Sequence, residues 1–148
     1  MTPIQIDEKL TRYLRWLEGL LPQWVEDWSN EVRRAFMGRE EVSLRSLDRS
    51  IDRYAKALKI YWETGSESVL EELDSRDEPS LAPGAERRLS EFVRVLQIGR
   101  RSLIRHLSQS RLSGKKQIEQ SLERSFEQIS YWYMDRFQAR ADNLLSQA

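Results

Sequence analysis

His106 is the residue best suited to chemistry in this chain, because it is the only histidine among 148 residues and cysteine is absent. A metal site with two histidine ligands from one chain is therefore excluded, as are thiolate nucleophiles, iron–sulfur clusters, cysteine-ligated zinc and a covalently attached bilin. The chemical role left to His106 is that of a haem axial ligand in a globin-like pocket. A simpler interpretation is a boundary residue, since a turn of about 100° per residue places His106 at the edge of an apolar helical stripe.

Arg100 lies within that stripe rather than at its edge. The stripe consists of Leu89, Val93, Leu96, Leu103 and Leu107. An inward-facing arginine needs a partner, because a buried and unpaired guanidinium is costly. We expect a structural ion pair with an acidic residue of the early helices. The functional alternative is recognition of an anionic ligand or of a carboxylate on a partner protein.

Two pairs of adjacent carboxylates, Glu40–Glu41 and Glu71–Glu72, are the other candidates for acid or base chemistry. Adjacent positions diverge on a helix and each pair lies in a charged stretch, so both pairs are expected to be solvated. The chain has neither a glycine-rich phosphate loop nor a Gly-x-Ser-x-Gly turn. Because no nucleophile is paired with a base, we expect a protein that is not an enzyme and that uses no cofactor or metal.

Charge is balanced overall, with 24 basic and 24 acidic residues, but it is unevenly distributed. Residues 63–78 are rich in Asp and Glu, whereas residues 92–118 contain basic side chains and no acid. The basic residues of segment 94–116 outside the stripe are Arg94, Arg101, Arg105, Arg111, Lys115 and Lys116. We expect a solvated face. The alternative is an adaptor or nucleic-acid-binding surface whose affinity falls steeply with salt, although the balanced total charge does not favour nucleic acid.

The elements that must position these residues are helices, because every strongly periodic stretch has apolar residues three or four positions apart. Pro22 lacks an amide hydrogen and is expected to separate a first helix from a second that carries Trp24 and Trp28. The predicted helical segments are residues 7–21, 22–36, 43–62, 67–73, 85–108 and 113–146, with a loop over 74–84. The pattern predicts an all-α fold: a single bundle of about five to six helices with a long C-terminal helix, forming one domain over residues 1–148.

Large side chains occupy four consecutive positions of the last helix: Tyr131, Trp132, Tyr133 and Met134. Consecutive positions point in directions about 100° apart, so one buried face cannot cover all of them. Val95 and Ile98 of the preceding helix also fall outside its main stripe. We therefore expect a homodimer whose interface includes Val95, Ile98, Tyr131 and Trp132.

No apolar run in the sequence approaches the ~20 residues that span a bilayer, and no basic region followed by an apolar one stands at the N-terminus. We expect a cytoplasmic protein that makes no contact with membranes.

Three segments stand in an order that is typical of one known family. They are the tryptophan-bearing segment Leu20–Trp28 (LLPQWVEDW), an acidic loop region, and Leu89–Leu103 (LSEFVRVLQIGRRSL), which precedes a long final helix. This pattern resembles the N-terminal helical input domain of RsbR-type stressosome proteins and of some sensor kinases, often called the RsbRD N-terminal domain. The segment Leu89–Leu103 is the part most similar to that family.

The resemblance implies a helical bundle related to the globin fold, usually without haem, that dimerises and passes a signal through its last helix to a STAS, kinase or similar module. It implies no ligand-binding residue, because members of the family share no common ligand. The chain ends at Ala148 with no output module. We expect either an excised sensor domain, with residues 135–148 starting a signalling helix, or a relative that acts through a separate signalling partner.

The resulting hypothesis is a non-enzymatic regulatory input domain of a bacterial signalling protein, of the stressosome or sensor-kinase type. Two alternatives from other classes remain open. One is a haem-binding globin-like sensor that uses His106, and the other is an adaptor or nucleic-acid-binding protein that uses the basic segment 94–116.

Overall fold

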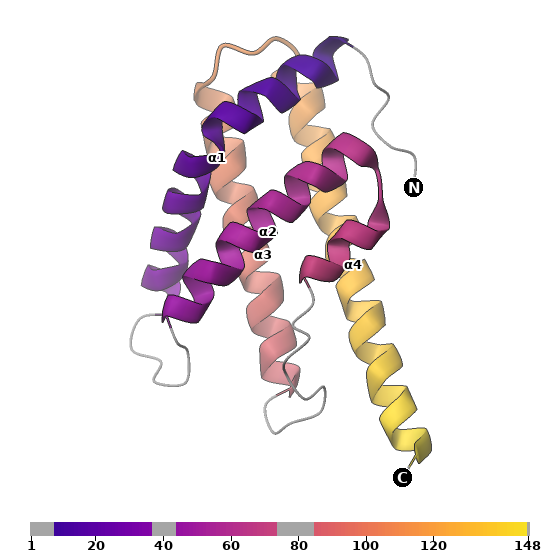
Figure 1. Ribbon diagram of the computed structural model, residues 1–148. Helices are drawn as coiled ribbons and strands as arrows, with labels where there is room; N and C mark the ends of the chain where they lie inside the picture. Colours follow the sequence, from indigo (N-terminus) through magenta and orange to yellow (C-terminus); the bar gives the residue numbers. More distant parts are fainter. Residues whose placement is uncertain (1–7, 37–43, 74–84, 148) are drawn as a thin grey trace.

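The computed structural model describes residues 8–36, 44–73 and 85–147. Within these ranges every element is helical, in the order α1 (Glu8–Ala35), α2 (Leu44–Thr64), the 3-10 helix η1 (Glu67–Leu73), α3 (Ala85–Gln109) and α4 (Lys115–Gln147). In Figure 1, α1 and α2 form a front layer that lies over α3 and α4. The described residues thus form an all-α bundle of four α-helices and one 3-10 helix, where the sequence predicts five or six helices.

The helix break expected at Pro22 does not occur, because α1 continues through this proline as one helix. Pro22 removes one intrahelical hydrogen bond, but Leu17 before it and Trp24 after it are both completely buried. Both halves are therefore held to the same core. The helix bends instead of ending, and a bend is a common effect of a proline inside a helix. In Figure 1, α1 runs across the top of the molecule and then turns down one side.

The other predicted segments match the structure closely. Helix α2 ends where Gly65 adopts a φ of 70° and its amide donates to the carbonyl of Tyr61 at 2.7 Å, a conformation that favours glycine. Residues 67–73 form the predicted short helix, which is of the 3-10 type. The predicted loop over 74–84 lies outside the described residues.

Helices α3 and α4 run antiparallel, joined by a short turn in which Gly114 has a φ of 72°. Two contacts show their register. Arg100 lies beside Glu123 near the middle of the pair, and the ring of Phe92 stacks on that of Tyr133 with centroids 3.7 Å apart nearer the open end. Residues of α3 and α4 whose numbers sum to about 224 therefore lie at the same height, meaning the same level along the helix axes.

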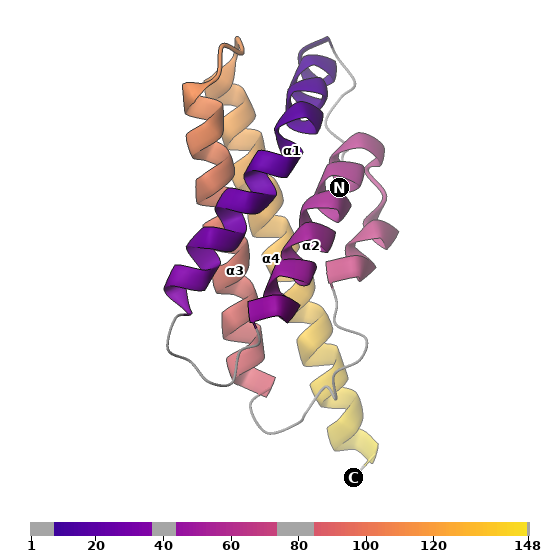
Figure 2. The same cartoon turned by 60° about the vertical axis from the view of Figure 1, so that its left-hand side comes forward.

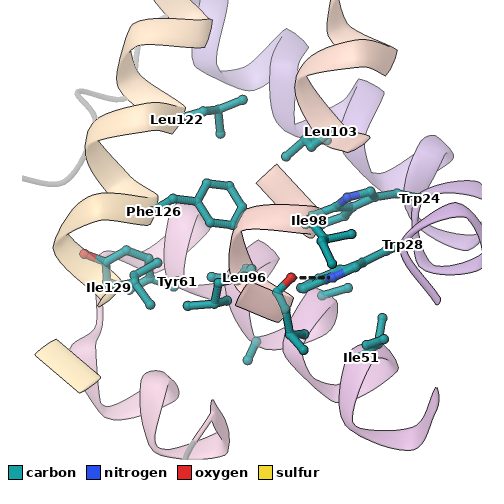
Figure 3. Close-up of a cluster of buried hydrophobic side chains, with 14 of the residues drawn as sticks. Trp24, Trp28, Ile51, Tyr61, Leu96, Ile98, Leu103, Leu122, Phe126 and Ile129 are labelled. Carbon is teal, nitrogen blue, oxygen red and sulfur yellow. Dashed lines mark hydrogen bonds between the residues drawn. The ribbon is translucent and has the colours of Figure 1, made fainter. Parts of the chain in front are cut away.

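Three buried tryptophans, Trp24, Trp28 and Trp62, pack together in the core, and Figure 3 shows the first two. The rings of Trp24 and Trp28 stack at 5.1 Å, and Trp62 stacks on Trp24 at 6.3 Å. Each indole N–H is satisfied: Trp28 donates to the carbonyl of Val95 at 2.8 Å, Trp24 to that of Gly99 at 3.0 Å, and Trp62 to the hydroxyl of Ser125 at 2.8 Å. These bonds connect the front layer to both helices of the rear layer. Because a buried donor without a partner is costly, they favour this packing of the two layers.

Candidate interaction surface on helices α3 and α4

An open groove of ≈ 410 Å³ runs between α3 and α4, and all its lining residues come from these two helices. The α3 wall is formed by Val93, Leu96, Gln97 and Arg100. The α4 wall is formed by Glu123, Phe126, Glu127, Ser130, Tyr131 and Met134. The floor is apolar and the rims are charged, an arrangement that is typical of surfaces that bind another molecule.

Tyr131 is the most exposed large hydrophobic side chain at this groove. It is 56% exposed, and its hydroxyl donates to a carboxylate oxygen of Glu127 at 3.4 Å, a long bond that holds the ring weakly. One other large hydrophobic residue among those described is comparably exposed, Ile60 on α2 at 43%. The expectation that one ring of the segment 131–134 is left uncovered is therefore met by Tyr131.

Arg100 has an ion-pair partner, but not one from the early helices as the sequence led us to expect. Its Nη1 lies 3.7 Å from Oε1 of Glu123 on α4, and the two side chains are 33% and 48% exposed. A single long contact between partly exposed groups contributes little to stability. Arg100 is therefore placed on the groove rim, where it is accessible from outside the chain.

The expectation that Val95 and Ile98 belong to an outer interface is wrong for this structure. Both lie in the core, with 4% and 2% of their surface exposed. The cause is that α3 packs against α1 on one side and α4 on another, so its buried arc is wider than one helical stripe. Ile98 lies close to the tryptophans of α1 in Figure 3.

Trp132, the fourth expected interface residue, is half-buried and packs against the core. The guanidinium of Arg136 lies 4.9 Å from the centre of its ring, and the same guanidinium makes two hydrogen bonds of 2.7 Å to the carboxylate of Glu71 on η1. Glu71 is thus engaged rather than freely solvated. Nothing in the sequence indicated this clamp, which joins positions 65 residues apart.

His106 lies at the seam between α1 and α3, half-buried, with its Nε2 2.6 Å from Oδ2 of Asp27. Beside it, Arg105 pairs with Glu31 of the same helix α1. The nitrogen that would bind a haem iron is thus already engaged by a carboxylate. The contact supports the interpretation of His106 as a boundary residue, and here the early helices do supply the acidic partners.

Three basic residues of the segment 94–116 contact other groups of this chain. Arg94 lies over the ring of Phe36 at 5.4 Å, Arg105 is paired with Glu31, and Lys115 donates to the carbonyl of Ser108 at 3.1 Å. These contacts use part of the positive charge that a nucleic-acid surface would need.

Other chemistry finds little support among the described residues. In the part of the chain that the structure describes, no three His, Asp or Glu side chains gather where they could hold a metal ion. No helix of that part is both long and apolar enough to cross a bilayer. The pair Glu40–Glu41 lies outside the described residues.

The comparisons with known proteins identify no relative. No protein-family model matches the chain, and neither a curated protein nor a solved structure is significantly similar to it. The resemblance to RsbR-type input domains therefore stays a prediction. The all-α bundle and the α3–α4 groove are the findings on which a functional proposal has to rest.

Proposed function

We propose that this chain is a non-enzymatic regulatory input domain, with a globin-like bundle, that forms a homodimer through the groove on α3 and α4. The observation that carries the proposal is the exposed ring of Tyr131 over an apolar floor with charged rims. The ring and the apolar floor beside it form a continuous apolar surface with a polar rim, which is the layout of an interaction site, and interface cores are enriched in Tyr and Met. The resemblance to RsbR-type domains supports the same function, in the cytoplasm, with a separate signalling protein or module as the output partner.

Helix α4 is the element best placed to relay a signal. It has 33 residues, and its C-terminal end extends beyond the other described helices (Figures 1 and 2). The contacts of its C-terminal half include the stacking of Tyr133 on Phe92 and the pairing of Arg136 with Glu71. Helices at subunit interfaces have discrete packing alternatives, so a shift of α4 against η1 and α3 would change the position of its end.

The proposal is tested by the mass of the purified protein, measured by light scattering over a range of concentrations. We expect a dimer that Tyr131→Ala weakens by about tenfold or more in Kd, since truncating a central interface aromatic costs over 1 kcal/mol. Ile60→Ala is the matched control, because Ile60 is also exposed but lies on α2, and this variant should dimerise normally. A wild-type protein that stays monomeric at high concentration would refute the proposed function.

A further inference from the structure

The two walls of the groove carry opposite charge. The only charged lining residue of α3 is the cation Arg100, whereas α4 contributes the carboxylates Glu123 and Glu127 and no cation. The pair of Arg100 with Glu123, at 3.7 Å, places these groups at the same height along the bundle. The groove therefore has one cation on its α3 wall and two carboxylates on its α4 wall, and the two helices are antiparallel.

A second copy can be placed face to face on this surface about either of two symmetry axes, because a homodimer interface joins a patch to itself. A two-fold axis parallel to the helices sets each α3 on the partner's α4 at equal height. A two-fold axis perpendicular to the helices, in the plane of the face, sets α3 on α3 and α4 on α4. The charges distinguish the two arrangements.

With the parallel axis, Arg100 of each protomer faces the partner's Glu123 and the partner's Glu127, and this attraction occurs twice. With the perpendicular axis, the carboxylates of one α4 face those of the other and Arg100 faces its own copy. Like charges placed opposite one another at an interface disfavour that arrangement. With the parallel axis, Tyr131 also lies opposite the partner's Val93, because 131 and 93 sum to 224. The exposed ring then packs against an apolar side chain.

We propose that the second copy docks with its two-fold axis parallel to α3 and α4, and that Arg100 specifies this arrangement by pairing with Glu123 and Glu127 across the interface. The inference rests on the proposed dimer and adds its geometry. The two α4 helices then end on the same side of the dimer, as an input domain that acts on one output partner requires.

Charge reversal tests the pairing. Arg100→Glu and Glu123→Arg each place like charges across the parallel interface, so we expect each homodimer to weaken by about tenfold or more in Kd. Combining Arg100→Glu with Glu123→Arg in one chain restores attraction between these two positions across the parallel interface, whereas about the perpendicular axis like charges still face one another. We therefore expect the double variant to dimerise more tightly than either single variant, measured by light scattering. Both side chains are partly exposed, and circular dichroism checks that the variants remain folded.

Cysteine cross-linking gives a second, independent measurement, since the chain contains no cysteine. Chains with Gln97→Cys mixed with chains with Glu127→Cys should form mixed disulfides, because 97 and 127 lie at equal height on different helices. The perpendicular axis through the groove instead pairs each position with itself. A stable dimer that ignores charge reversal, or that cross-links each variant only to itself, overturns the parallel axis and leaves the dimer intact. A monomeric wild-type protein overturns the proposed function as well.

Discussion

Gly99 stands where the indole of Trp28 meets the backbone of α3, and a Cβ atom built there would overlap the six-membered ring of that indole. Gly99→Ala should therefore lower the free energy of unfolding by about 1–3 kcal/mol, because Trp28 or α3 has to move. Denaturant titration followed by tryptophan fluorescence measures this. Gly19→Ala on α1 is the control, since no atom lies within 4 Å of its Cβ, and it should raise stability by about 0.5–1 kcal/mol. Equal losses from both variants would contradict this close approach.

Ser125 is a buried polar residue whose hydroxyl accepts the indole N–H of Trp62 at 2.8 Å. Ser125→Ala leaves that donor buried without a partner, and we expect a loss of about 1–3 kcal/mol in the free energy of unfolding. Ser121→Ala, one turn earlier on the same helix, controls for the change in helix propensity and should have little effect. If the two variants unfold at the same denaturant concentration, the bond contributes nothing.

Tyr13 is buried, its hydroxyl has no hydrogen-bond partner among the described residues, and burial raises the pKa of this phenol far above its usual range. The folded state thus holds the proton more tightly than the unfolded chain does. Stability is fully present below the unfolded pKa of about 10 and should fall as the pH rises above it. Tyr13→Phe should reduce this fall without lowering stability at pH 7, whereas an unchanged pH profile would exclude Tyr13 as its cause. Some dependence should remain from Tyr61, whose pKa is raised by burial and by Glu67.

At the scale of elements, helical periodicity was enough to predict most of the segments, because apolar residues recur three or four positions apart along each helix. The segment 67–73 and the ends of α3 and α4 were predicted within one or two residues. Pro22 was not interpreted correctly, since local rules give the cost of a proline but not the burial of Leu17 and Trp24 that holds α1 together.

The candidate site was predictable only in part, for a related reason. The crowding of aromatic residues at 131–134 correctly indicated an uncovered ring, but Val95 and Ile98 were misassigned because the second neighbour of α3 is not visible in a one-dimensional pattern. The contacts of Arg136 with Glu71 and of His106 with Asp27 join positions 65 and 79 residues apart. No local spacing contains such pairings.

The contact between Arg136 and Glu71 fastens η1 to α4, and both side chains are more than a third exposed. Glu71→Gln should therefore change the global free energy of unfolding by less than about 1 kcal/mol. Its effect should be local: faster amide hydrogen exchange in η1 and in the lower half of α4, measured by mass spectrometry. Glu67→Gln, also on η1 and exposed, is the control. Equal exchange in both variants would show that η1 is held by Leu70 in the core rather than by the clamp.

At the scale of the whole molecule, the inner faces of the two helical layers cover one another, whereas the groove between α3 and α4 is open. The inner face of the α1–α2 layer buries its tryptophans against α3 and α4, while the groove of the rear layer opens on a side where neither α1 nor α2 contributes a lining residue. A second copy on that side would complete a four-helix arrangement of α3 and α4 from both protomers. Such bundles cover apolar stripes on all sides, and the charges of the two walls then set its symmetry.

The parallel dimer makes a prediction about distances that spans the molecule. Asp142 is an exposed residue near the end of α4, and Asp142→Cys allows a spin label in this cysteine-free chain. Because the two-fold axis runs along the helices, the two labels lie at the same end, at a distance shorter than the length of α4, about 50 Å for its 33 residues. Labels at Ile60→Cys lie on the front layers, on opposite outer sides of the dimer, and should be farther apart than those at 142. Pulsed electron paramagnetic resonance measures both distances, and the reverse order would mean that the α4 helices end at opposite poles, where they could not act together on one output partner.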